Sequence, residues 1–128
     1  MPTILVVEDH PLHQVHLRQL LEGEGYRVHM SADGQDAYDL LAGDFTPDLL
    51  LTDVSLPGMS GLELTRGVRR LAHLRTLPIV VRSAMDTDYG RGEACAAGAD
   101  AFVSKREAAG DLLRTLRGLL SADPVELP

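Results

Sequence analysis

The sequence has a single cysteine, no long apolar run and few basic residues. One cysteine excludes an intramolecular disulfide and a zinc site built from cysteines. Because Cys95 lies in a run of small residues, 94–98, we expect it to be packed. The N-terminus lacks a basic segment followed by an apolar one, and no stretch of about 18 apolar residues occurs. We therefore expect a soluble, cytoplasmic protein with no signal peptide and no membrane span.

Basic residues are outnumbered, with 12 Lys and Arg against 19 Asp and Glu and a formal net charge of -7. This balance argues against direct nucleic-acid binding, which needs concentrated positive charge. The tightest basic group has roughly helical spacing and is interpreted as a solvent-facing helix surface: Arg66, Arg69, Arg70 and Arg75.

Five short apolar runs alternate with segments of helical periodicity within the 128 residues. The runs predict strands over 4–7, 26–30, 48–52, 79–81 and 101–103, and most lack the alternation of a half-exposed strand. The pattern predicts one α/β domain with a parallel sheet, helices on both faces and right-handed crossovers. Residues 1–122 form this domain, and residues 123–128 are a tail or the start of a linker.

Four of the intervening segments carry an apolar helical face, formed by Leu17, Leu20 and Leu21, by Ala37, Leu40 and Leu41, by Leu64, Val68 and Leu71, and by Leu113, Leu116 and Leu120. The fourth helix, about 86–97, has few large apolar residues and should be the least firmly packed. Asp33 and Ser60 are predicted N-caps, and Gly23, Gly43 and Gly98 lie where helices should end.

Polar residues follow four of the predicted strands: Glu8 and Asp9, Asp53, Ser83, and Lys105. Ligands of open parallel sheets bind at the carboxyl ends of the strands, so these residues should converge. A hard cation such as Mg²⁺ and the Lys105 ammonium would offset the carboxylate charges. Asp53 would then stay ionised and able to attack phosphorus.

Each of these residues also has an ordinary explanation when it is considered alone. Glu8 or Asp9 could cap the helix that begins near Pro11, Ser83 could cap the next helix, and Lys105 could be a surface lysine. The placement of all of them at the ends of strands of one sheet favours the functional interpretation.

The chain resembles the receiver domains of two-component response regulators over residues 3 to about 121. The resemblance rests on the segments 5–9 (LVVED), 48–61 (DLLLTDVSLPGMSG), 81–84 (VRSA) and 98–105 (GADAFVSK). It implies a flavodoxin-like, doubly wound (βα)5 fold with a five-stranded parallel sheet in the order 2-1-3-4-5.

The resemblance also implies the chemistry of a phosphoacceptor. Asp53 would take a phosphoryl group from a phosphohistidine on a sensor kinase or histidine phosphotransfer domain. Asp9 would bind Mg²⁺ directly and Glu8 through water, with Asp53 and the backbone carbonyl of Ser55 as the other protein ligands. Lys105 would pair with the phosphoryl group. The domain is expected to catalyse only its own phosphorylation and dephosphorylation, and not to be an enzyme.

A switch is implied in the same way. Ser83 would hydrogen-bond the phosphoryl oxygen and Phe102 would follow it inward, repacking the surface of helix four, strand five and helix five. An effector domain, a target protein or a second copy of the chain would bind there. Phe102 stands where Tyr is more frequent, and Arg106 stands where many receivers have a cis-proline.

Two other classes of function are weighed against this one. The domain could be a receiver-like interaction module that works without phosphorylation. It could also be a flavodoxin or an aspartyl-phosphate phosphatase, but the acidic Glu8-Asp9 loop would repel a flavin phosphate, and Ser55 replaces the second Asp of such phosphatases. His13 and His16 lie at i, i+3, and we interpret them as a solvated helix face rather than a metal site.

Overall fold

The computed structural model describes residues 1–85 and 87–121. The expected tail 123–128 and the expected start of helix four at residue 86 lie outside this part of the chain. No helix among the described residues has the length and apolar character needed to cross a bilayer.

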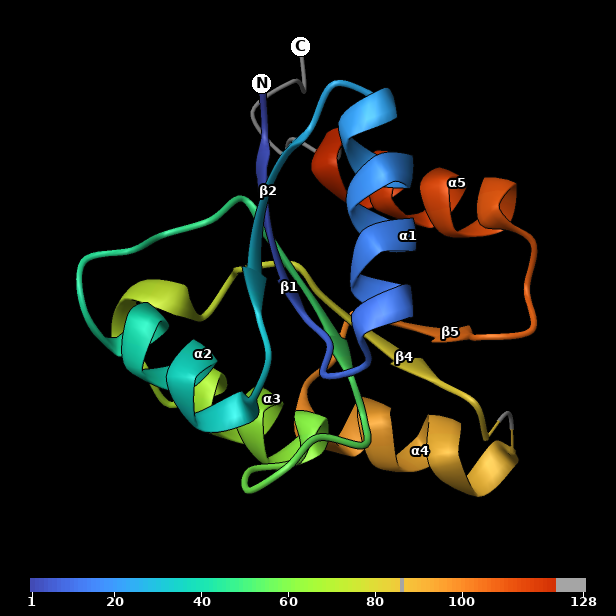
Figure 1. Cartoon of the computed structure of the whole chain (residues 1–128). Helices are drawn as coiled ribbons and strands as arrows, with labels where there is room; N and C mark the ends of the chain where they lie inside the picture. Colours follow the sequence, from blue (N-terminus) through green and yellow to red (C-terminus); the bar gives the residue numbers. More distant parts are fainter. Residues whose placement is uncertain (86, 122–128) are drawn as a thin grey trace, which may run out of the picture.

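Five parallel strands form one sheet, in the order β2-β1-β3-β4-β5 (Figure 1). Their bounds are β1 Thr3–Val7, β2 Arg27–Ser31, β3 Leu49–Asp53, β4 Ile79–Ser83 and β5 Ala101–Ser104. This confirms the predicted (βα)5 fold and its strand order. The third and fourth strands run further toward their carboxyl ends than the apolar runs, so that Asp53 and Ser83 are the last residues of β3 and β4.

Five α-helices cover both faces of the sheet: α1 Pro11–Gly23, α2 Gly34–Ala42, α3 Gly61–Arg69, α4 Asp88–Ala97 and α5 Ala109–Ser121, with a short 3-10 turn, η1, at Ala72–Leu74. Helices α1 and α5 lie on one face, and α2, α3 and α4 lie on the other (Figure 1). The α1/α5 face buries Leu17, Leu21 and Leu116, and the other face buries Ala37, Leu41 and Leu64. The predicted helical faces are therefore the core faces.

Helix starts follow the sequence signals with one correction. Asp33 and Ser60 cap α2 and α3 as predicted, and Ser60 forms a reciprocal capping box with Glu63. The cap of α1 is neither Glu8 nor Asp9. It is His10, whose Nδ1 accepts the Leu12 N–H at 3.2 Å.

Two interpretations of side-chain exposure were wrong. Cys95 is exposed, because the helical period places Ala94 and Ala97 of α4 on the core face and Cys95 between them. Arg69 is not a solvated residue. Its guanidinium donates to Gly98 O at 2.9 Å and to Leu77 O at 2.7 Å, and pairs with Asp100 at 2.9 Å.

Helix α4 is lightly packed, as predicted. Its buried residues are the two alanines, Ala94 and Ala97, which remove little apolar surface from water. Thr87 caps its N-terminus by accepting the Gly90 N–H, so the alternative that Ser83 caps this helix was wrong. Gly98 ends the helix in the left-handed region, at φ 106°, where a side chain would be strained.

Candidate functional site

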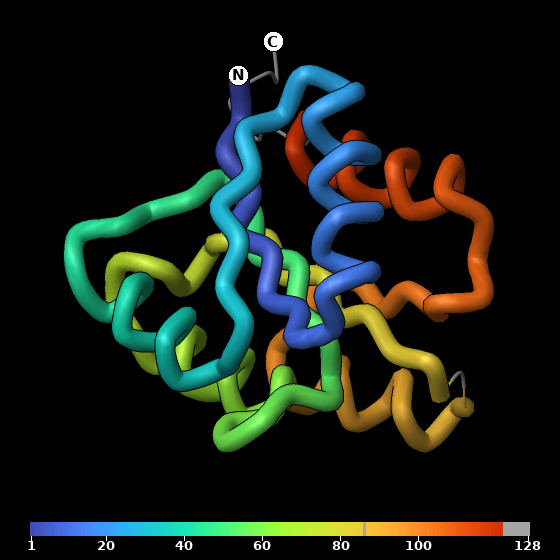
Figure 2. Tube along the Cα trace, viewed as in Figure 1, coloured from blue at the N-terminus to red at the C-terminus, as the bar shows by residue number. Residues whose placement is uncertain are grey.

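The carboxyl ends of β1, β3, β4 and β5 lie at one edge of the sheet (Figure 2), and the predicted site residues stand at or directly after these ends. Parallel pairing aligns Val7 with Thr52, Asp53 with Arg82, and Ser83 with Ser104. Glu8 and Asp9 follow β1, and Lys105 follows β5. Because the register is continuous across these strands, residues separated by almost the whole chain become neighbours.

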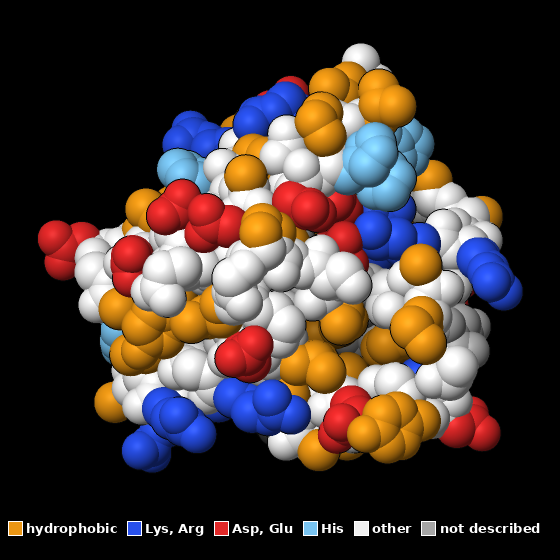
Figure 3. Space-filling model, turned by 60° about the horizontal axis from the view of Figure 1, so that its bottom comes forward, with side chains coloured by type: hydrophobic (Ala, Val, Ile, Leu, Met, Phe, Trp, Pro, Cys, Tyr) orange, Lys and Arg blue, Asp and Glu red, His pale blue; other side chains and the backbone are white. Residues whose placement is uncertain are grey.

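Three carboxylates meet at this edge. One oxygen from each of Glu8, Asp9 and Asp53 lies within 4.8 Å of the others. Glu8 is 1% exposed and Asp53 is 6% exposed, whereas Asp9 is open to solvent. Acidic side chains gather on this face of the molecule, with histidine and basic side chains beside them (Figure 3). Hard oxygen donors so close together, two of them buried, fit a divalent cation such as Mg²⁺.

Lys105, the only lysine in the chain, supplies positive charge to the carboxylates. Its Nζ lies 2.7 Å from Asp53 Oδ2 and 3.6 Å from Glu8 Oε1. The other oxygen of Asp53, Oδ1, accepts the Ser55 N–H at 3.4 Å. Both oxygens of Asp53 are thus turned toward positive or partly positive groups.

A second basic group near Glu8 was missed by the sequence reasoning. Arg82 Nη1 and His13 Nδ1 each lie 3.6 Å from Glu8 Oε1, and no hydrogen bond satisfies any of these three buried atoms within the described residues. Glu8 Oε2 accepts the His10 N–H at 3.1 Å. The available signal was an arginine directly after the apolar run 79–81, which is unusual in a strand buried on both faces.

The two predicted switch residues flank a small apolar hollow. Ser83 Oγ accepts the Met85 N–H at 3.0 Å, which leaves its own hydrogen available to another acceptor. Phe102 is half-buried, and Arg91 Cζ lies 4.8 Å from the centre of its ring. Ser83, Phe102 and Val54 are among the residues that line this hollow, which has a volume of about 200 Å³.

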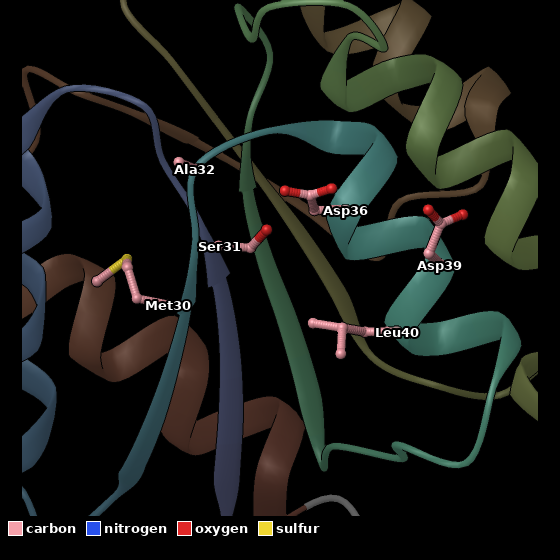
Figure 4. A pocket seen from close by; sticks show the side chains of 6 residues that line it. All are labelled: Met30, Ser31, Ala32, Asp36, Asp39 and Leu40. Carbon is pink, nitrogen blue, oxygen red and sulfur yellow. The ribbon is translucent and has the colours of Figure 1, made fainter.

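Another hollow belongs to a different part of the surface. It measures about 470 Å³ and lies between β2 and α2, lined by Met30, Ser31, Ala32, Asp36, Asp39 and Leu40 (Figure 4). None of the carboxylates at the strand ends lines it. The pKa of Asp36 is raised, chiefly by repulsion from Asp33 and further by desolvation. This hollow is an open acidic surface and offers no group that would retain an anionic ligand.

A family model described as the response regulator receiver domain matches residues 4–117. The chain belongs to this family. Receiver domains of this kind are signalling domains of two-component systems, and the match covers every strand end described above.

Relatives of this receiver domain include response regulator MprA of Mycolicibacterium vanbaalenii, which is 39% identical over 117 residues and 91% of this chain. The phosphate regulon transcriptional regulatory protein PhoB of Rhizobium meliloti is 36% identical over 94% of this chain. The matches take in 49% and 52% of those proteins, so the chain spans about half the length of these relatives.

The fold also matches that of a receiver domain whose structure has been solved. The receiver domain of sensor histidine kinase PA1611 from Pseudomonas aeruginosa superposes with a TM-score of 0.87 at 30% identity, covering 94% of this chain and 98% of that one. That structure has a magnesium ion coordinated in its active-site cleft.

Proposed function

We propose that this receiver domain is phosphorylated on Asp53 by a phosphohistidine of a sensor kinase or phosphotransfer domain, with Mg²⁺ held by Glu8, Asp9, Asp53 and the backbone carbonyl of Ser55. The observation that carries the proposal is the contact between Lys105 Nζ and Asp53 Oδ2, at a site where three carboxylates lie within 4.8 Å. An isolated surface aspartate would have neither feature.

Asp53, Lys105 and Ser83 have different roles in phosphoryl transfer. An Asp53 oxygen forms the new P–O bond while the P–N bond of the donor breaks and its electron pair returns to the imidazole. Lys105 neutralises charge on the phosphoryl oxygens, and the Ser83 hydroxyl donates to one of them. When bound, Mg²⁺ would stabilise the charge that develops on those oxygens.

The switch follows from a change in the negative partner of Lys105. Lys105 pairs with Asp53 before transfer and with the phosphoryl group afterwards, so its position is tied to the state of Asp53. Ser83 is drawn to the new acceptor, and the hollow of about 200 Å³ beside it gives the Phe102 ring room to move inward. The movement alters the surface of α4, β5 and α5, where an effector domain, a target or a second copy of the chain binds.

The boundaries and the setting of the domain belong to the same proposal. The receiver occupies residues 1–122 and is followed by a tail or linker at 123–128. It catalyses no reaction besides gain and loss of its own phosphoryl group, and it acts in the cytoplasm. These points are supported by the family and by the sequence patterns.

The test is phosphorylation by acetyl phosphate and by candidate kinases with Mg²⁺, followed by intact-mass measurement. We expect a gain of one phosphoryl group in the wild type that is lost with hydroxylamine, as for an acyl phosphate. The gain should vanish in Asp53→Asn and persist in the matched control Asp44→Asn, which alters an exposed aspartate elsewhere. It should also vanish when EDTA removes the metal.

The competing candidate is an interaction module that works without phosphorylation. It predicts no mass gain with any donor and no spectral response to beryllofluoride with Mg²⁺. Either a wild type that stays unmodified by all donors, or an Asp53→Asn variant that still gains the phosphoryl group, would contradict the proposal.

A further inference from the structure

We propose that Arg82 sets the Mg²⁺ affinity of this site by occupying the buried side of Glu8, so that the metal binds weakly and reversibly. This inference rests on the proposed function, because it concerns the same carboxylates. It assigns Arg82 a positioning and affinity-setting role, with no contact to the phosphoryl group.

Like Asp53, Glu8 has both of its oxygens facing positive or partly positive groups, but three cationic or basic side chains gather at one of them. Oε1 has Arg82 Nη1, His13 Nδ1 and Lys105 Nζ, each at 3.6 Å, and Oε2 accepts the N–H of His10 at 3.1 Å. The Glu8 side chain is 1% exposed and that of Arg82 is 13% exposed. The attraction between them is therefore weakly screened by solvent.

The distance of 3.6 Å between Glu8 Oε1 and Arg82 Nη1 is longer than a hydrogen bond. Glu8 Oε1 and Arg82 Nη1 attract each other without a hydrogen bond, and neither of these buried atoms has a hydrogen-bond partner among the described residues. The contact between Glu8 and Arg82 is thus one of charge without a hydrogen bond. Glu8 remains free to turn an oxygen toward a cation, but the cation must compete with Arg82 for the same negative charge.

The charge count shows the consequence. Glu8, Asp9 and Asp53 contribute three negative charges, and Lys105 with Arg82 offsets two of them. Without Arg82 the site would carry one more uncompensated negative charge beside the buried Glu8. A divalent cation would then bind more tightly, and the protein without metal would be less stable, since a buried carboxylate would have one cation fewer beside it.

The test compares Mg²⁺ binding by isothermal titration calorimetry in three variants and the wild type. Arg82→Met removes the charge but keeps the apolar stem, and should bind Mg²⁺ about tenfold more tightly, a difference of about 1.4 kcal/mol. Arg82→Lys keeps the charge and should stay near the wild type. Arg117→Met removes an exposed arginine of α5 and changes the net charge of the protein by the same amount. It should leave the Mg²⁺ affinity unchanged.

A second measurement separates this role from simple structural support. Saturating Mg²⁺ should raise the unfolding temperature more in Arg82→Met than in the wild type, because tighter binding stabilises the folded state more. If Arg82→Met does not fold, Arg82→Gln takes its place, because its amide can donate to Glu8 without carrying charge. It should also bind Mg²⁺ several-fold more tightly, by the same loss of charge.

The measured Mg²⁺ affinities of these variants decide whether Arg82 has the proposed role. Unchanged or weaker Mg²⁺ binding in Arg82→Met or Arg82→Gln overturns the inference, and so does tighter binding in Arg82→Lys or Arg117→Met. A wild type that binds no Mg²⁺ refutes the proposed function itself. Wild-type binding with no effect of Arg82 refutes only the role assigned to Arg82.

Discussion

Lys105 Nζ lies 2.7 Å from Asp53 Oδ2, although 52 residues separate the two in the chain. The two residues stand at the ends of β5 and β3, on either side of β4 in the sheet. The ion pair therefore joins strands that share no backbone hydrogen bonds. It also keeps the most buried charges of the site compensated, which links the site to the stability of the domain.

Lys105→Met should lower the free energy of unfolding by about 1–3 kcal/mol, because it leaves Asp53 without its nearest cation and Glu8 with one cation fewer. Urea denaturation at neutral pH measures this loss. In the double variant Asp53→Asn with Lys105→Met the loss should be smaller than the sum of the two single effects. Additive effects would mean that the two side chains do not interact.

Gly61→Ala should destabilise the fold by about 1–3 kcal/mol, because the new methyl group would overlap the carbonyl oxygen of Asp53. The overlap would also push the end of β3 and slow phosphorylation of Asp53. Gly118→Ala is the matched control, since nothing lies within 4 Å of its Cβ position in α5. It should be neutral or stabilising by up to about 1 kcal/mol. Thermal unfolding of the two variants tests the contrast, and equal effects would contradict it.

Arg69→Met should lower the free energy of unfolding by about 2–4 kcal/mol, because it leaves the carbonyls of Gly98 and Leu77 without their side-chain donor and the carboxylate of Asp100 without its ion-pair partner. Arg70→Met, next along the chain and exposed, should change stability by less than about 0.5 kcal/mol. Chemical denaturation of both variants measures the difference. A small loss in Arg69→Met would show that the contacts contribute little.

The carboxyl pKa of Asp36 is raised above 3.8, first by the charge of Asp33. Its folded form therefore holds a proton more tightly than the unfolded chain. The stability from this group is complete below pH 3.8 and is lost as the pH rises through the raised pKa. Asp33→Asn should shift the Asp36 pKa back toward 3.8 and reduce this loss, while the amide oxygen still caps α2.

Carbon-detected NMR titration of the Asp36 carboxyl group provides the measurement. Asp44→Asn is the control, because Asp44 is not among the groups that shift Asp36. An Asp36 pKa that is the same in Asp33→Asn and in the wild type would rule out the charge of Asp33 as the principal cause.

Much of the fold was predictable because it depends on local periodicity. The continuous apolar runs identified buried parallel strands, and the spacing of Leu64 and Val68 identified the core face of α3. The caps at Asp33 and Ser60 were predictable for the same reason, since a cap forms with residues two or three positions away. The exposure of Cys95 was not predictable in this way. Composition shows that a segment consists of small residues, but it does not show which of them face the sheet.

The sequence by itself indicated the order of strands and helices and the candidate set Glu8, Asp9, Asp53, Ser83 and Lys105, because side chains at the ends of parallel strands meet at one edge. Only the tertiary structure decided how these charges are compensated. The approach of Arg82 to Glu8, and of Arg69 to Gly98, depends on the packing of long side chains between elements that are distant in sequence. No local sequence pattern encodes those distances. The contacts of the basic side chains with Glu8 and Asp53 are what compensate the negative charge of the site.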